Sequence, residues 1–379
     1  MTNRNLPQIH AIVKMHKNPR KFRFIIGDRL GVQKQVAKKM VRILQLIQNV
    51  TKRYCDKVQL FSGINRYWVI DNSSKVLDDV RRINERNGAR SMEQFDFTTL
   101  YTNISQDDLK EKLMSITERA FKGGQNQYIR TNNWRASWTN TQSKDRNVYS
   151  KDMIRNMIEL IVDGAFFSFG SQVYHQIVGI PMGIDPAPQM ANLYLHFYEA
   201  QFMERLSKEN YGQARKFCHT RRFIDDLNTF NNDGILDFYN KEGKIYPEEM
   251  VLNKENESNL KGTFLELEMQ IQGKSIEVKL YDKREAFNFE IVNYPHMDSN
   301  IPRKTAYGVF ISQMIRFARI CMLKDDFLYR MKLLVSKLLL KGYDVDTLKK
   351  NARRCMERHK WIMKKCTHND INQVFISSD

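Results

Sequence analysis

The pattern of apolar and polar positions divides the chain into a strand-rich start, a mixed centre and a helical end. Residues 6–30 alternate apolar and basic side chains, which predicts two strands around a turn at 17–19. Residues 32–50 repeat apolar positions every three or four residues, which predicts an amphipathic helix. Residues 307–366 are helical in pattern almost throughout, with Gly342 as a natural helix stop. The two ends of the chain are therefore expected to differ in secondary structure, with strands at the start and helices at the end.

The centre of the chain mixes the two periodicities. Residues 123–149 are polar and rich in asparagine, which predicts a long excursion or a poorly ordered hairpin. The other expected elements are a short strand around 95–97, a helix capped by Ser105 with Asp108 three residues later, a helix buried on one side over 191–206, and paired strands over 264–271 and 276–281. Together these elements predict an α+β fold.

The charge of the chain is large and unevenly placed. The formal net charge is +18, and residues 1–57 carry 14 Lys and Arg against 2 acids, while residues 303–366 carry 17 against 5. Basic flanks around a mildly acidic centre are typical of a protein that grips a polyanion, because binding of phosphates releases their counterions. A generic basic surface that aids solubility is the alternative reading.

Composition excludes several other classes. The hydrophobic fraction of 42% excludes wholesale disorder. The longest uncharged stretch, 164–184, holds four glycines and a proline, so no membrane span is expected, and residues 1–4 lack the apolar core of a secretion signal. Five cysteines without a CxxC pair favour a reducing compartment. We therefore expect an intracellular location.

Carboxylates flanked by apolar residues are the anomaly that points to chemistry. Asp96 lies between two phenylalanines, on the opposite face of its strand, and Asp225 and Asp226 lie between apolar runs at an expected hairpin tip. An anion beside aromatic rings is costly unless a cation compensates it. Two Mg²⁺ ions would do so and could carry phosphoryl chemistry. For each aspartate alone, a turn or capping role is the simpler reading.

Around these carboxylates the chain carries an ordered series of motifs. In chain order they are Lys14–Lys17, Lys21–Ile25, Asp96–Ile104, Gly179–Gly183, Ala187–Leu195, Phe223–Leu227, Thr263–Leu267, Asn300–Pro302 and Tyr307–Val309. The series resembles the successive motifs of a reverse transcriptase, and specifically those of Penelope-like elements, which are relatives of telomerase. The resemblance runs from about Leu6 to Cys366, nearly the whole chain.

The resemblance implies a right-hand polymerase with fingers over 1–92, a palm of antiparallel sheet and helices over 93–300, with the insertion at about 123–149, and a helical thumb over 301–379. Its implied partners are an RNA template, a DNA or RNA primer and dNTPs, and nuclear residence would follow from chromosomal targets. No sequence of the GIY-YIG nuclease that many Penelope-like proteins carry is present, so we expect no intrinsic DNA nicking.

Site roles follow from the chemistry and the resemblance together. The expected metal ligands are Asp96 and Asp225, with Asp226 secondary, for two Mg²⁺ ions that Mn²⁺ can replace. The expected nucleotide-binding residues are Lys14 and Arg23 on the triphosphate, Tyr101 as a steric gate against the ribose 2′-hydroxyl, Gly183 beside the nascent base pair and Gln189 near the template, with Lys254 a candidate general acid.

The chain also departs from the family pattern. Ile184-Asp185-Pro186 stands where relatives commonly have Thr-Asn-Cys, and the extra carboxylate could repel triphosphate, perturb metal binding or point away. The sequence thus predicts an RNA-directed DNA polymerase. A catalytically impaired nucleic-acid-binding protein that has kept the scaffold, and template-independent nucleotide addition, stay open as alternatives.

Overall fold

The computed structural model describes residues 6–15, 19–27, 31–122, 127–142, 147–181, 183–240, 244–287, 289 and 291–376. They form two compact units, the first made of residues 1–71 and 95–255 and the second of residues 72–94 and 256–379. The chain thus leaves the first unit after residue 71, returns to it within one strand at residue 95 and leaves it again after residue 255. The three-part division expected from the resemblance stays a prediction.

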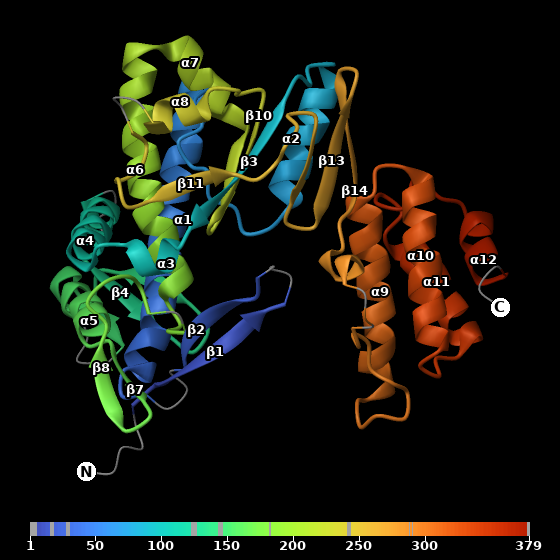
Figure 1. Ribbon diagram of the computed structural model, residues 1–379, viewed down its shortest axis with the longest axis horizontal. Coiled ribbons are helices and arrows are strands. Elements are labelled where there is room, and N and C mark those ends of the chain that lie inside the picture. The colour runs from blue at the N-terminus through green and yellow to red at the C-terminus, as the bar shows by residue number, and fades with distance from the viewer. Residues whose placement is uncertain are drawn as a thin grey trace. The chain divides into compact units, whose positions relative to one another are not determined.

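The first unit mixes helices with short strands (Figure 1). Its elements are β1 (Gln8–Lys14), β2 (Lys21–Gly27), α1 (Lys34–Ser62), β3 (Met92–Thr98, which starts in the second unit), α3 (Leu100–Asn103), α4 (Gln106–Lys122), β4 (Tyr128–Thr131), β5 (Ala136–Thr139), β6 (Val148–Tyr149), α5 (Lys151–Asp163), β7 (Phe166–Phe169), β8 (Gln172–His175), α6 (Ala187–Glu209), α7 (Tyr211–Lys216), η1 (Phe217–His219), β9 (Thr220–Phe223), β10 (Asp226–Phe230), α8 (Ile235–Asn240) and β11 (Val251–Lys254). With the sheet and helices of the second unit, they confirm the predicted α+β fold.

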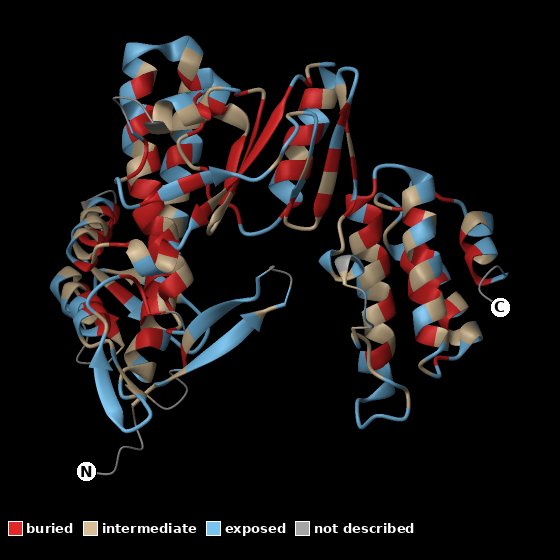
Figure 2. Ribbon diagram, viewed as in Figure 1, coloured by how far each residue is buried: buried red, intermediate tan, exposed pale blue. Residues whose placement is uncertain are grey.

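Three small sheets organise the strands of the first unit. The strand orders are β2-β1-β7-β8, β11-β3-β10-β9 and β5-β4-β6. In the first sheet, β1 and β2 pair antiparallel from Gln8 opposite Gly27 to Lys14 opposite Lys21, which confirms the hairpin expected over residues 6–30. The turn residues 17 and 18 lie outside the described residues. Figure 2 shows that β1 and β2 are largely exposed.

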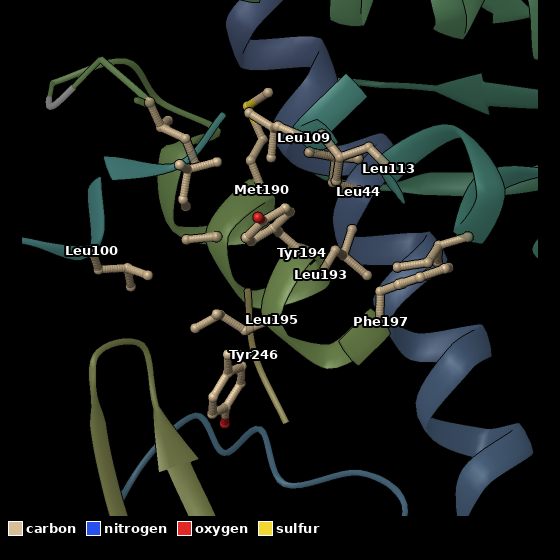
Figure 3. Close-up of a cluster of buried hydrophobic side chains, with 14 of the residues drawn as sticks. Leu44, Leu100, Leu109, Leu113, Met190, Leu193, Tyr194, Leu195, Phe197 and Tyr246 are labelled. Carbon is tan, nitrogen blue, oxygen red and sulfur yellow. The ribbon is translucent and has the colours of Figure 1, made fainter. Parts of the chain in front are cut away.

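Helix α6 runs through the core of the first unit. Figure 3 shows Met190, Leu193, Tyr194 and Leu195 among side chains of other helices, and every residue from Leu193 to Phe197 is buried. The expectation of a helix buried on one side is therefore wrong for the middle of α6, which is buried all round its circumference. The reason is that several elements cover it, since both α1 and α4 pack against α6.

Two other elements of the first unit differ from expectation. Helix α1 continues to Ser62, well beyond the predicted end at residue 50, and ends at Gly63 in the left-handed conformation. In the polar stretch 123–149, the described residues form a three-stranded sheet, β5-β4-β6, and not a long excursion or a poorly ordered hairpin. Residues 123–126 and 143–146 lie outside the described part.

The second unit combines one antiparallel sheet with helices. Its elements are α2 (Ser74–Glu85), β12 (Lys261–Phe264), β13 (Leu267–Gln272), β14 (Ser275–Leu280), η2 (Lys283–Ala286), α9 (Arg303–Ile320), α10 (Lys324–Leu339), α11 (Val345–Arg358) and α12 (His368–Ile376). The strand expected over 264–271 is interrupted, because Leu265 has a φ of 55° and turns the chain from β12 into β13. The helical end and the stop at Gly342, whose φ is 78°, are confirmed.

The helices carry no sign of a membrane crossing. In the described part of the chain, none combines the length and the apolar character that a span would need.

All five cysteines are free thiols.

Candidate active site

One sheet of the first unit, β11-β3-β10-β9, sets the strand of Asp96 beside the hairpin that carries Asp225. Asp96 lies in β3, and Asp225 lies in the turn that joins β9 to β10, which is the strand beside β3. The backbone N–H of Phe97 donates a hydrogen bond to the carbonyl oxygen of Asp225 at 3.2 Å. A backbone hydrogen bond therefore joins the segments of Asp96 and Asp225, which are more than a hundred positions apart in sequence.

The strand alternation of β3 separates the core face from the polar face. Phe95 and Phe97 are buried, while Asp96 between them is half-buried, as the sequence pattern predicts. The register sets Asn253 of β11 opposite Asp96, and the Asn253 amide donates to the Thr98 hydroxyl. The polar face therefore carries carboxylate, amide and hydroxyl groups, which are ligands and hydrogen-bonding partners for a hydrated cation.

The turn that carries Asp225 has an unusual backbone. Phe223 pairs with Asp226, so only Ile224 and Asp225 form the loop of the hairpin. Ile224 has a φ of 54°, a left-handed conformation that β-branched residues rarely adopt. A residue held in such a conformation needs neighbours that fix it, and such residues cluster at functional sites.

A glycine loop joins the segment of Tyr101 to the strand of Arg23. The N–H of Ile180 donates to the Tyr101 carbonyl at 2.7 Å, and the N–H of Gly179 donates to the Ile104 carbonyl at 2.8 Å. Gly183 has a φ of 120°, and a Cβ there would lie 2.0 Å from the carbonyl oxygen of Ile26 in β2. Only glycine fits this position, because both its backbone conformation and its distance from β2 exclude a side chain.

The electrostatics of Tyr101 place three predicted residues in one neighbourhood. Burial raises the pKa of Tyr101 to about 12, and the charge of Asp225 acts in the same direction. The charges of Arg222 and Arg23 oppose this rise. Tyr101 is thus a neutral phenol at physiological pH, within electrostatic reach of both Asp225 and Arg23.

The predicted cations Lys14 and Arg23 share one face of the β1–β2 hairpin. Lys14 lies opposite Lys21, and Arg23 lies opposite Ile12, so the alternation puts all three cations on the same face. The other face carries Val13, Phe22 and Phe24. Arg23 is exposed and Lys14 is half-buried, so both guanidinium and ammonium groups are accessible to an anion.

Comparison with solved structures gives this arrangement a context. Telomerase from Candida albicans, in complex with a TWJ fragment of telomeric RNA, matches 99% of this chain at a TM-score of 0.63 and 13% identity. Apo telomerase from Candida tropicalis matches 100% of it at a TM-score of 0.52 and 12% identity. This chain shares the telomerase polymerase fold. It spans 64% of the length of each of these telomerase chains. No protein-family model and no curated protein matches the sequence.

Asp185, the acid at which the sequence departs from the family pattern, is paired with a lysine of the same unit. The Asp185 carboxylate forms an ion pair with Lys34, at the start of α1, at 2.8 Å. The second carboxylate oxygen is buried and accepts no hydrogen bond from the described residues, and the same holds for Oε1 of Gln189, one helical turn later. The extra carboxylate is therefore paired with a lysine, next to the N-terminus of α6.

The structure does not bring Lys254 to the polar face of β3. Lys254 lies opposite Phe95 in the β11–β3 register, whereas Asn253 lies opposite Asp96. Because successive residues alternate between faces, Lys254 is at a core-face position and Asp96 is on the other face. The side chain is exposed at the end of β11. A role for Lys254 as general acid stays a prediction.

Sequence reasoning missed a buried arginine beneath the Asp225 turn. Arg222 is completely buried and forms a two-pronged ion pair with Glu199 of α6. Its Nη1 donates to the Ile224 carbonyl at 2.8 Å and to the Asn192 side chain at 2.9 Å. The Tyr246 hydroxyl donates to the same Glu199 carboxylate at 2.9 Å. Arg222 therefore fixes the strained residue that immediately precedes Asp225.

A sequence signal for this pair does exist. Glu199 is a charge inside the largely apolar segment of the buried helix, and Arg222 comes directly before the apolar pair Phe223 and Ile224 at the hairpin tip. Buried charges of this kind are almost always paired. Their pairing with each other could not be read from spacing, because it depends on how α6 meets β9.

The donor set at Asp96 and Asp225 suits magnesium. In the described residues, no three or more His, Cys, Asp and Glu side chains lie together in a group that could hold a metal ion. Magnesium in polymerase sites is typically held by one or two carboxylates, with waters and substrate phosphates as its other ligands. Asp96 in β3 and Asp225 in the β9–β10 turn supply carboxylates, the ligand type that this requirement names.

Proposed function

We propose that this chain is an RNA-directed DNA polymerase that extends a primer 3′-hydroxyl with dNTPs. The observation that carries the proposal is the hydrogen bond from the Phe97 N–H to the Asp225 carbonyl, which joins the two predicted metal-ligand segments. The telomerase polymerase fold supports it independently. The finer assignment, to a Penelope-like retroelement or a domesticated relative with a nuclear location, rests on the motifs alone.

Asp96 and Asp225 would hold Mg²⁺ or Mn²⁺, with Asp226 beside them. When bound, two such ions activate the attacking hydroxyl and stabilise the leaving pyrophosphate. The protein's own contribution is to hold the carboxylates in place. Backbone hydrogen bonds between strands and the clamp of Arg222 on Ile224 restrict how far the Asp225 segment can move.

The remaining residues would bind the incoming nucleotide. Arg23 and Lys14, on one face of their hairpin, suit the triphosphate oxygens. Gly183 allows the backbone to approach the nascent base pair, and Tyr101 would lie beneath the sugar. Because Tyr101 stays neutral at physiological pH, its ring would act sterically without adding a charge beside the triphosphate.

The partners of the proposed reaction are an RNA template, a primer and dNTPs. The Candida albicans telomerase that this chain resembles was solved with an RNA fragment, which supports an RNA partner here. The alternative of a catalytically impaired nucleic-acid-binding protein was favoured by Asp185, an extra carboxylate that could repel a triphosphate. The ion pair with Lys34 weakens that argument, because a neutralised carboxylate does not repel a triphosphate.

Primer extension with the full chain tests the proposal. We expect Mg²⁺-dependent incorporation of dNTPs on a primed RNA template, and Asp96→Asn should abolish it while leaving duplex binding intact. Asp233→Asn, which changes an exposed acid in the loop after β10, is the matched control and should retain activity. Wild-type-like extension by Asp96→Asn would refute the assignment. Incorporation without template would favour template-independent addition.

Sugar selection tests the role of Tyr101. We expect Tyr101→Ala to admit ribonucleotides, because removal of the ring opens space for the 2′-hydroxyl. The measurement is the ratio of kcat/KM for dNTP and NTP, and Tyr101→Phe should keep the wild-type ratio. An unchanged ratio in Tyr101→Ala would remove the gate role but leave the polymerase proposal standing.

A further inference from the structure

Trp134 lies at the tip of a tightly hydrogen-bonded hairpin, outside the candidate active site. The Asn132 side chain accepts hydrogen bonds from the N–H groups of both Trp134 and Arg135 at 2.8 Å, and the Asn132 N–H donates to the Arg135 carbonyl at 2.9 Å. The turn is therefore well defined, yet the Trp134 side chain is 89% exposed. Trp138 in the same hairpin instead packs edge-on against Phe121.

The Trp134 side chain lines a cavity on the surface of α1. The cavity has a volume of about 520 Å³ and is open to solvent. Its lining residues are Lys38, Val41, Arg42, Gln45, Trp134 and Asp185. Lys38 and Arg42 are one helical turn apart and therefore share a face of α1. An aromatic plane, two cations and one amide thus meet in a single depression.

The charge of this cavity is positive. Asp185 is its one acid, and Lys34 already neutralises that carboxylate at 2.8 Å. Helix α1 as a whole carries seven Lys and Arg against one Asp. The ligand that fits is therefore an anion with a flat apolar ring, which is the chemistry of a nucleotide unit.

We propose that this cavity, the Trp134 site, binds single-stranded nucleic acid. One unpaired base stacks on the Trp134 indole, and the backbone phosphates lie at Lys38 and Arg42. Stacking on an aromatic side chain tolerates any base, and it requires a base that is free of a duplex. Asp185 lies two residues after Gly183, so the Trp134 site adjoins the glycine loop of the proposed nucleotide site. Binding there does not depend on catalysis.

Equilibrium binding of a labelled, unstructured polyuridylate RNA to the full chain tests the proposal. We expect Trp134→Ala to weaken this binding about tenfold, as loss of one stacked base does, and to leave the affinity for a blunt RNA–DNA duplex unchanged. The matched control is Phe61→Ala on the same helix, because Phe61 is 88% exposed and lies about 30 Å further along α1. Equal affinities for Trp134→Ala and the wild type, or equal losses for both variants, would overturn the proposal.

The salt dependence of the same binding tests the two cations. We expect Lys38→Gln/Arg42→Gln to reduce the slope of log K against log salt by about 1.4, since each phosphate contact on a single strand contributes about 0.7. Arg53→Gln/Lys57→Gln, a pair with the same spacing and charge elsewhere on α1, should keep the wild-type slope. An unchanged slope in the Lys38/Arg42 variant would place the phosphates elsewhere and contradict the proposal.

Polyuridylate binding and primer extension test the Trp134 site and the polymerase assignment separately. We expect Asp96→Asn to bind polyuridylate like the wild type. If Asp96→Asn extends primers, the polymerase assignment fails, while the Trp134 result still decides the binding site.

Discussion

Two hairpins of this protein, one in each unit, have the same turn and use it differently. In the β9–β10 hairpin, Ile224 has a φ of 54° and is followed by Asp225. In the β12–β13 hairpin, Leu265 has a φ of 55° and is followed by Glu266. Each is a two-residue loop in which a bulky apolar residue adopts the left-handed conformation and an acid comes second.

The difference lies in what the neighbouring arginine binds. Arg316 of α9 binds the Glu266 carboxylate at 2.6 Å, and the Ser73 hydroxyl donates to its other oxygen at 2.9 Å. In the other hairpin, Arg222 binds Glu199 and the Ile224 carbonyl. Among the described residues, no side chain donates a hydrogen bond to the Asp225 carboxylate or forms an ion pair with it.

The comparison shows how one turn geometry serves either structure or chemistry. The Glu266 carboxylate is neutralised by the side chains that hold it, so it has little capacity left for a metal. The Asp225 turn is instead held through its backbone, because Arg222 donates to the Ile224 carbonyl. A residue that must bind a cation needs this second arrangement, because a resident arginine on the carboxylate would compete with the metal.

The largest expected effect comes from removing the charge of the loop acid in each hairpin, Asp225 in one and Glu266 in the other. Asp225→Asn should lower dNTP incorporation by about a thousandfold, equivalent to about 4 kcal/mol of transition-state stabilisation, while the free energy of unfolding stays nearly constant. Glu266→Gln should instead lower stability by about 0.5–1 kcal/mol, since its ion pair is partly exposed. Primer extension and urea unfolding measure the two effects. If Asp225→Asn destabilises the chain as much as Glu266→Gln does, the distinction between the hairpins is wrong.

Removal of the clamp on Ile224 should give the next largest effect. Arg222→Met leaves Glu199 buried without its cation, which should cost about 3–5 kcal/mol of stability. Arg222→Met/Glu199→Leu removes both charges and should recover much of that loss, because apolar pairs often replace buried ion pairs well. Urea unfolding of both variants and of the wild type provides the comparison.

The activity of the same double variant separates a positioning role from a merely structural one. The Ile224 carbonyl still lacks its donor, so Asp225 should be misplaced and kcat should stay about a hundredfold low. The KM for dNTP should change little, because the triphosphate is bound elsewhere. Full recovery of kcat together with stability would show that Arg222 supports the fold alone.

Much of this framework could be predicted from local sequence patterns. The alternation Phe95-Asp96-Phe97 predicted a strand with its carboxylate on the polar face, and the helix capped by Ser105 is present, with its hydroxyl accepting from the Asp108 N–H at 3.5 Å. The apolar runs on either side of Asp225 predicted a hairpin tip. These features depend on residues within one or two turns of each other, and the sequence records them directly.

Features that depend on distant contacts could not be predicted in this way. A strand over 264–271 was expected because Leu265 carries no turn signature, and its left-handed conformation follows from the surrounding contacts. The pairing of Arg222 with Glu199 depends on the meeting of a strand and a helix. That Lys34 neutralises Asp185 is equally a product of the tertiary fold.

Over the range from pH 6.5 to 4.5, the smallest effect is the response of the two hairpins to acid. Burial lowers the pKa of His196 to about 3, and the charges of Arg222 and Arg119 act in the same direction. In the unfolded chain, His196 takes up a proton near its ordinary pKa of 6.5. Between pH 6.5 and 3 the unfolded state therefore binds more protons, so the stability is complete above pH 6.5 and falls as the pH drops. The fall is at most about 1.4 kcal/mol per pH unit for this one group.

Hydrogen exchange can localise this response. After correction for intrinsic rates, the amides of β9 and β10 should lose more protection between pH 6.5 and 4.5 than those of β12 and β13, because His196 lies within the electrostatic reach of Arg222. His196→Phe keeps a ring against Tyr67 and should abolish the difference, whereas His296→Phe, at an exposed position of the second unit, should not. Equal loss in both hairpins would mean that carboxylates common to both units govern the acid response. In that case the buried Arg222 cluster would be no more sensitive to acid than the exposed ion pair at Glu266.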